Sequence, residues 1–281
     1  MKFLGSALLL LFAGLSLAHA QIKTPQPSPL QTVTQRVGIT DITVEYSRPG
    51  MKERKVFGDL VPFGELWRTG ANSATKVSSA GGFMFGSLKV EPGDYSLFTI
   101  PDKTEWTIIL NRDPKTNTTR YDQKQDVGRF KVKVSKAPTK YETFTIDFTN
   151  LGDSTALMRL LWDQTMIEIP ISTPVDAQVM TQIEQEVINK TPENANLYFQ
   201  AANYYLNTNR NLQQALDWAT KAVEADRQYW KVHLQAKLYE KLGRCPDAIK
   251  AAEESKKLSQ EGQNPAYVKM NEELLARCGK K

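Results

Sequence analysis

Residues 64–75, GELWRTGANSAT, combine side chains that suit binding better than catalysis. Trp67 offers a flat apolar face, Arg68 offers a fork of donors for an anion or a carbonyl, and Asn72 offers an amide donor and acceptor. These three are the candidate ligand-binding residues. The alternative is structural: the segment plugs one open end of the fold, Trp67 joins the core, Arg68 bonds backbone carbonyls or a buried carboxylate, and Asn72 caps a turn.

Groups for nucleophilic or metal chemistry are sparse. His233 is the one histidine after residue 20, and the two cysteines both lie in the second half of the chain. This excludes Ser-His-Asp and Cys-His arrangements from the first half and leaves zinc without its usual ligands. The carboxylates of Asp113, Asp122 and Asp126 could hold calcium, but their spacing does not match an EF-hand. We therefore expect no metal site, no cofactor and a polar, solvated connection at residues 111–126.

A pair of carboxylates remains available for acid–base work, as in glycoside hydrolysis. Asp59 and Glu65 are the candidates, with Glu105 as a third acid. They support an alternative in which the protein is a carboxylate-dependent hydrolase that acts on glycans or envelope polymers.

The elements that position these residues change type along the chain. Residues 30–171 contain short runs rich in β-branched and aromatic residues, which predict about eight to ten strands and an antiparallel β-sandwich or barrel-like domain. Within it, the turn residues Pro92–Asp94 predict a hairpin over residues 86–100. Residues 154–171 are predicted to fold back around Asp163 and Gln164. A long connection at residues 49–75 is expected to be either a functional loop or a self-packed one.

From Pro174 the apolar residues Val175, Val179, Ile183 and Val187 follow a helical period. We therefore predict a two-domain α+β chain, with a β domain over residues 21–173 and a helical domain over residues 174–281.

The helical half resembles tetratricopeptide repeats. Ala215-Leu216 recurs 33 positions later as Ala248-Ile249, and the second copy has small, aromatic and glycine residues where that repeat places them: Ala236, Tyr239, Gly243, Ala248, Ala252 and Ser255. The resemblance implies stacked helical hairpins, with Gly243 ending the first helix of its pair in a left-handed conformation. An unrelated helical bundle is the alternative.

Three stretches of the first half also resemble a known family. They are PSPLQTVTQRVGITDITVEYSRPGMKERKVFGDLVPFGELWRTGANSATKV, FGSLKVEPGDYSLFTIP and EWTIILNR. The family consists of exported bacterial proteins and is known as a domain of unknown function; the resemblance covers residues 24 to about 171. It implies export and a β fold, and it implies no activity.

The first twenty residues read as a cleaved signal peptide. Lys2 precedes the apolar run FLGSALLLLFAGLSL, and Ala18-His19-Ala20 matches a signal peptidase site. We expect a periplasmic or secreted bacterial protein that begins at Gln21, with no transmembrane segment after cleavage. The net charge of +5 is spread along the chain, and with export it argues against nucleic acid as a partner.

The two cysteines, Cys245 and Cys278, are also 33 positions apart. An oxidising compartment permits a disulfide between them, although equivalent points of stacked repeats lie about 10 Å apart, beyond the Cα separation of about 7 Å that a disulfide accepts. A bridge and two separate thiols both remain open.

Together these features favour a non-enzymatic binding or scaffolding protein of the cell envelope. The helical repeats would bind a protein or peptide partner, and the connection at residues 49–75 would bind a ligand, with a carbohydrate among the candidates. The hydrolase is the alternative function.

Overall fold

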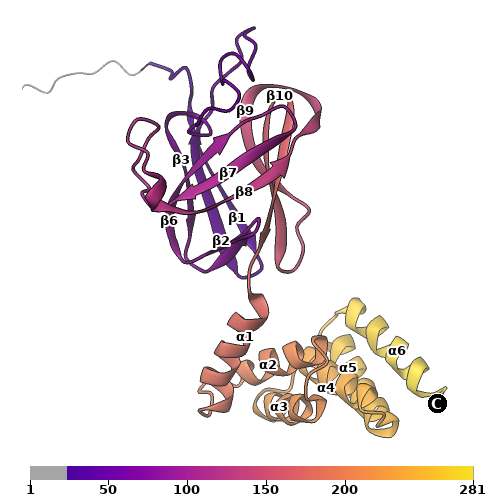
Figure 1. The fold of residues 1–281 in the computed structure, drawn as a ribbon. Helices are drawn as coiled ribbons and strands as arrows, with labels where there is room; N and C mark the ends of the chain where they lie inside the picture. Colours follow the sequence, from indigo (N-terminus) through magenta and orange to yellow (C-terminus); the bar gives the residue numbers. More distant parts are fainter. Residues whose placement is uncertain (1–23, 281) are drawn as a thin grey trace, which may run out of the picture. The chain divides into compact units, whose positions relative to one another are not determined.

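The structure is a computed structural model that describes residues 24–280; the expected signal peptide at residues 1–20 lies outside the described residues. The chain divides into two compact units between Thr173 and Pro174. The first unit consists of strands and the second of helices (Figure 1). In the described part of the chain, every helix is too short or too polar to cross a membrane.

The first unit contains two antiparallel sheets. The larger has the strand order β1-β2-β3-β6-β7-β8, with the bounds Leu30–Val37, Thr40–Ser47, Ala71–Ser79, Gly93–Ile100, Glu105–Asn111 and Asp126–Lys133. The smaller has the order β5-β4-β10-β9, with the bounds Leu88–Val90, Phe83–Phe85, Thr155–Ser172 and Ser135–Thr149.

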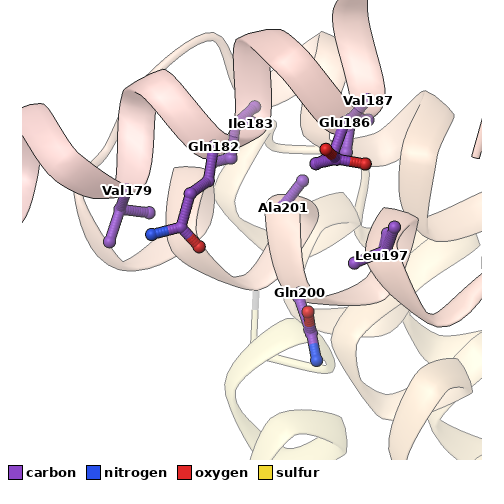
Figure 2. A pocket seen from close by; sticks show the side chains of 8 residues that line it. All are labelled: Val179, Gln182, Ile183, Glu186, Val187, Leu197, Gln200 and Ala201. Carbon is purple, nitrogen blue, oxygen red and sulfur yellow. The ribbon is translucent and has the colours of Figure 1, made fainter. Parts of the chain in front are cut away.

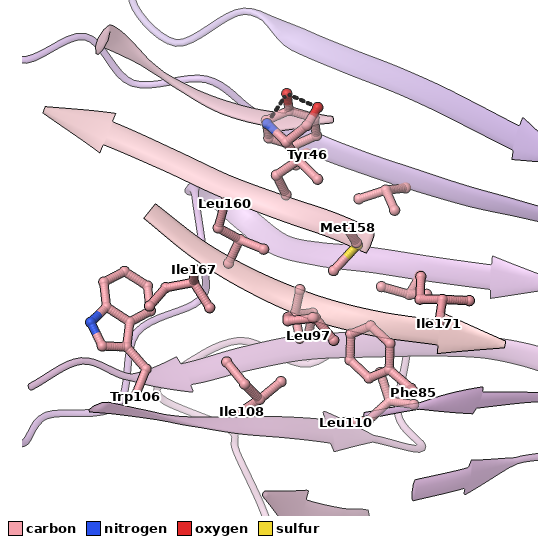
Figure 3. Packing of buried hydrophobic residues seen from close by; sticks show 14 of the residues in the cluster. Tyr46, Phe85, Leu97, Trp106, Ile108, Leu110, Met158, Leu160, Ile167 and Ile171 are labelled. Atoms are coloured by element: carbon pink, nitrogen blue, oxygen red, sulfur yellow. Dashed lines mark hydrogen bonds between the residues drawn. The ribbon is translucent and has the colours of Figure 1, made fainter. Parts of the chain in front are cut away.

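The two sheets share one hydrophobic core. Because successive side chains of a strand point to opposite faces, alternate residues of each sheet enter it. They include Ile42, Val44, Leu97 and Ile108 from the larger sheet and Phe85, Phe144, Met158 and Leu160 from the smaller one. Figure 3 shows side chains of this cluster between the strands. The Tyr46 hydroxyl joins the sheets directly, since it donates to the Ile146 carbonyl at 3.2 Å and accepts from the Ile146 N–H at 2.7 Å.

Two expectations about strand connections are wrong. The turn at Pro92 does not close a hairpin, because β5 pairs with β4 in the smaller sheet while β6 pairs with β3 and β7 in the larger one. Residues 155–172 do not fold back either, because they form the single strand β10, which pairs with β9. Asp163 has a φ of 54° and lies at a register shift, so the Asp-Gln pair makes a bulge instead of a turn.

The second unit consists of the following elements in chain order: α1 (Val175–Ile183), the π-helical segment η2 (Glu184–Ile188), α2 (Asn196–Asn207), α3 (Leu212–Ala225), α4 (Tyr229–Lys241), α5 (Cys245–Glu261) and α6 (Pro265–Cys278). Helix α2 packs on α3, and α4 packs on α5. The start of α3 is capped by the Asn211 side chain, which accepts the Gln214 N–H at 3.1 Å. The end of α4 is confirmed at Gly243, whose φ of 74° is the left-handed conformation expected there.

A buried polar network joins α4, α5 and α6. The Asn271 amide donates to the Ser255 hydroxyl and to the Tyr267 carbonyl, both at 2.8 Å. Its oxygen must therefore accept from His233 Nδ1, which lies 2.7 Å away, and this fixes the proton of the neutral imidazole on Nδ1. The Ser255 hydroxyl in turn donates to the Tyr229 carbonyl.

Burial lowers the pKa of His233, although the hydrogen bond to Asn271 opposes this effect. Among the charges nearby, Lys237 and Arg277 also lower this pKa and Glu240 raises it. The folded unit therefore takes up a proton at His233 less readily than the unfolded chain does.

We predict that acidification from pH 7 to pH 5 destabilises the helical unit through His233. The folded pKa lies below the unfolded value of about 6.5, so the stabilisation is complete above that pH and is lost as the pH falls. Thermal unfolding followed by circular dichroism at 222 nm should show a midpoint lower by a few degrees at pH 5. The His233→Gln variant keeps an amide donor and should lose most of this pH dependence; an equal dependence in the variant contradicts the assignment.

Candidate functional site

The long connection between β2 and β3 places Trp67 in the core. Its indole stacks on Trp162 at a ring distance of 5.9 Å and meets the edges of Trp106, Phe144 and Phe57 at 5.1–6.1 Å. The Trp67 N–H and carbonyl both pair with Thr99 of β6, at 2.8 and 2.9 Å. Trp67 is therefore a packing residue, with no free face for a ligand to stack on.

A strained turn follows Trp67. Thr69 is fully buried and has a φ of 54°, a conformation that a β-branched residue adopts rarely and at a cost of roughly 1–3 kcal/mol. Its hydroxyl bonds Thr99, and its carbonyl accepts from the Thr75 hydroxyl. At Gly70 a Cβ would lie 3.0 Å from the Ser47 carbonyl oxygen, so glycine is required there. The sequence interpretation missed Thr69, because nothing in its residue type indicates a left-handed conformation.

Arg68 and Asn72 lie close together on the other side of this segment. Arg68 Nη1 donates to the Asn72 carbonyl at 2.9 Å. Asn72 also has a positive φ, of 58°, and its side-chain amide donates to the Ser47 hydroxyl at 3.1 Å. The structure thus brings together two of the three candidate ligand-binding residues and separates Trp67 from them.

A polar pocket of about 300 Å³ opens beside Asn72. One wall comes from β2 and β3, with Glu45, Asn72, Ser73 and Lys76. The other wall comes from the β7–β8 connection, residues 112–125, with Lys115, Thr116, Asn117 and Arg120. Arg68 is not part of this lining, and its contribution is to hold the backbone of Asn72.

The β7–β8 connection is anchored on the face of the larger sheet that points away from the shared core. Ser96 donates to the Asp113 carbonyl at 2.8 Å, and the Asn111 amide donates to the Asp122 carbonyl at 3.0 Å. The Tyr121 ring meets Phe98 of the sheet edge-on at 5.1 Å. The connection is mostly exposed and joins the paired strands β7 and β8, as its polar composition predicts, and these contacts also fix it as a wall of the pocket.

The far end of this connection is held by charge. The Tyr121 hydroxyl donates to Asp126 at 2.7 Å, and Arg129 pairs with the same carboxylate at 2.8 Å. Burial, reinforced by the Asp126 carboxylate, raises the pKa of Tyr121 to about 12, so the phenol remains a neutral donor. Asp126 is committed to these partners, while Asp113 and Asp122 accept backbone N–H groups of the connection itself. Residues 24–280 contain no group of three or more His, Cys, Asp or Glu side chains placed to hold a metal.

Comparison with known proteins identifies the first unit. Residues 28–171 match the DUF2911 family, which is described as a protein of unknown function. The chain belongs to the DUF2911 family. This confirms the resemblance of the first half to a domain of unknown function. No curated protein and no solved structure matches the chain.

The acid candidates of this DUF2911 protein lie away from the polar pocket. Asp59 and Glu65 are both exposed, and neither contributes to the lining. Glu105 is paired with Lys131 of the neighbouring strand at 2.5 Å. Among the described residues, the one carboxylate that lines the pocket is Glu45, which the sequence interpretation did not single out because it lies on a strand with ordinary alternation.

Cys245 and Cys278 are not joined by a disulfide in the structure. Cys278 is buried in the cluster formed by α4, α5 and α6, and Cys245 packs against the same cluster from the start of α5. The structure therefore contains the two separate thiols that the sequence left open, with both side chains in one apolar region.

We predict that Trp67→Ala strongly destabilises the β unit while Arg68→Ala does not. Truncation of a buried aromatic residue costs about 3–5 kcal/mol, whereas loss of one partly exposed hydrogen bond costs at most about 1.5 kcal/mol. Hydrogen exchange of peptides from β6 and β7, measured in urea, reports the β unit separately from the helices. A similar effect of both substitutions would contradict the placement of Trp67 as a core residue.

Proposed function

We propose that this DUF2911 protein is a non-enzymatic binding protein of an exported compartment, and that its β unit binds a small polar ligand in the polar pocket. The observation that carries the proposal is the pocket itself, about 300 Å³ between β3 and an anchored connection. This volume lies at the lower end of the range for small-molecule sites, about 300–1,000 Å³. The exported location rests on the sequence of residues 1–20 and on the resemblance of the first half to a family of exported proteins.

The composition of the pocket supports binding over hydrolysis. Among residues 24–280, its lining contains one carboxylate, Glu45, and neither histidine nor cysteine. Hydrolysis by two acids needs a second carboxyl group across the bond that is cleaved. Asp59 and Glu65 lie outside the lining, so their placement lends no support to the hydrolase alternative.

The pocket walls offer several hydrogen-bonding groups of modest size. Ser73 and Thr116 contribute hydroxyls, and Asn72 and Asn117 contribute amides. Such groups suit ligands with several oxygens, among them carbohydrates. Because the walls are held by backbone and side-chain hydrogen bonds, little ordering is needed when a ligand enters.

We predict that a bulky residue at position 73 abolishes ligand binding. Ser73 is exposed and lines the pocket, so Ser73→Trp should fill the space without disturbing the core. The chain without residues 1–20 would be screened by native mass spectrometry and calorimetry against monosaccharides, uronic acids, sugar phosphates and amino acids. Every binder found should bind Ser73→Trp at least 10-fold more weakly.

The matched control is Ser87→Trp, at an exposed turn residue outside the pocket, which should bind as the unmodified chain does. The proposal is wrong if no member of the panel binds, or if binding survives Ser73→Trp.

For the helical unit we propose a peptide partner, and a specific apolar notch favours this assignment. It has a volume of about 110 Å³ and lies between α1 with η2 on one side and α2 on the other (Figure 2). Val179, Ile183 and Leu197 line it, and Gln182, Glu186 and Gln200 supply polar groups. A π-helical turn such as η2 widens a helix locally and is often found at functional sites. The space suits one aliphatic side chain of an extended segment.

We predict that peptides selected against the full mature chain from a random display library share an aliphatic anchor residue. Gln182→Trp would cover the notch from an exposed position and should weaken these peptides at least 10-fold. Gln260→Trp, at an exposed position of α5, is the matched control and should leave their affinity unchanged. Failure to enrich peptides, or equal binding by both variants, would remove the peptide assignment.

A further inference from the structure

We infer that the ligand of the polar pocket is a small organic anion whose carboxylate or phosphate group is held by Lys115 and Arg120. This inference rests on the proposed function of the pocket and specifies the ligand class. The binding group is defined by its charge and its oxygen acceptors, which carboxylates and phosphates share.

The cations of the pocket outnumber its acid. Lys76, Lys115 and Arg120 line it, against the single carboxylate of Glu45. Lys76 is already compensated, since its ammonium lies 3.2 Å from Asp94. After this pairing, the pocket has two uncompensated positive charges, Lys115 and Arg120, and one negative charge, Glu45.

Both remaining cations have donors to spare. Arg120 uses Nη2 to donate to the Lys115 carbonyl at 3.0 Å, and its other guanidinium nitrogens have no partner within residues 24–280. Within residues 24–280, the hydrogen bonds of Lys115 involve its backbone N–H and carbonyl and leave Nζ available. A guanidinium with spare donors binds carboxylates and phosphates through two parallel hydrogen bonds, and the ammonium of Lys115, in the lining of the same pocket, adds a second positive charge.

The backbone that carries the two cations is fixed by its own side chains. The Lys115 N–H donates to the Asp113 carboxylate at 3.0 Å. The Asn117 side-chain oxygen accepts from the N–H groups of Thr119 and Arg120, at 3.2 and 3.0 Å. These bonds hold the starting points of the Lys115 and Arg120 side chains on one side of the pocket, so only the side chains themselves must order when an anion binds.

The pocket also lacks the feature that neutral sugars use most. The part of the chain that the structure describes contributes no aromatic side chain to its lining, so a sugar ring finds no flat apolar face there to stack on. Discrimination must then come from charge and hydrogen bonds. This favours an acidic ligand over its neutral counterpart.

Glu45 provides an independent test of the inference, because its negative charge repels any anion in the pocket. Replacement of Glu45 by Gln removes this repulsion and keeps the size of the side chain. The variant should therefore bind an anion more tightly than the unmodified chain, an outcome that a general loss of structure cannot produce.

The test uses the chain without residues 1–20 and three probes of one scaffold: glucose, glucuronate and glucose 6-phosphate. Calorimetry at low salt should show binding of at least one acidic probe, with glucose at least 10-fold weaker. Lys115→Met and Arg120→Met should each weaken the acidic probe about 5-fold or more, and Glu45→Gln should tighten it. Lys89→Met is the matched control, since Lys89 pairs with Glu91 on the smaller sheet and should have no effect.

The outcomes separate the inference from the proposed function. If glucose binds as well as the acids, or if neither Met substitution changes the affinity, the anion inference is wrong while the binding function stands. If none of the three probes binds, the anion inference is wrong, and the wider panel screened against Ser73→Trp decides the binding function. Binding of the acids that weakens with added salt and with both Met substitutions supports the inference.

Discussion

The β unit depends on one contact, the insertion of the Trp67 indole between its two sheets. The connection that carries Trp67 begins against the smaller sheet, where the Met51 N–H donates to the Glu142 carbonyl at 2.8 Å and the Phe144 N–H donates to the Pro49 carbonyl at 2.9 Å. It ends against the larger sheet, at the pair formed with Thr99. The segment thus crosses from the smaller sheet to the larger one, and the Trp67 indole fills the space between the two sheets beneath it.

This buried contact also sets the polar surface next to it. Because neighbouring residues of an extended chain point in opposite directions, Leu66 and Arg68 face outward when Trp67 faces the core. Leu66 packs in the small cluster of Phe98 and Tyr121 that supports the β7–β8 connection. Arg68 then fixes the backbone of Asn72 at the edge of the pocket. The strained conformation of Thr69 is maintained because the neighbouring residues on both sides are held by these contacts.

The sequence predicts the type and ends of the elements that depend on neighbouring residues. It does not predict which strands pair, because that depends on segments far apart in the chain. The two antiparallel sheets and the helices that follow them come from the period of apolar residues, and the end of α4 comes from Gly243. The turn at Pro92 was interpreted as a hairpin because its residues specify a change of direction, but they do not specify which sheet the next strand joins. Asp163 likewise favours a positive φ, which a bulge within β10 satisfies as well as a turn does. At the pocket, Asn72 was found from its type, whereas Glu45, Lys115 and Arg120 come together only through pairing of strands far apart in the chain.

The two units differ in whether mild acid changes the protonation of the side chains at the centre of their polar contacts. Histidine is the side chain whose ordinary pKa lies in the mildly acidic range, and residues 24–173 contain none. In that unit the anchor of the pocket wall is Tyr121, whose pKa of about 12 keeps its proton in place throughout the neutral range. In the helical unit the central polar contact is His233, whose pKa is lowered by burial and whose Nδ1 proton is held by the Asn271 side-chain oxygen. Mild acid is therefore expected to act on the packing of α4, α5 and α6 and to leave the Tyr121 anchor of the pocket wall protonated. The ligand binding that we propose for the β unit should then persist at a pH where the helical unit has begun to loosen.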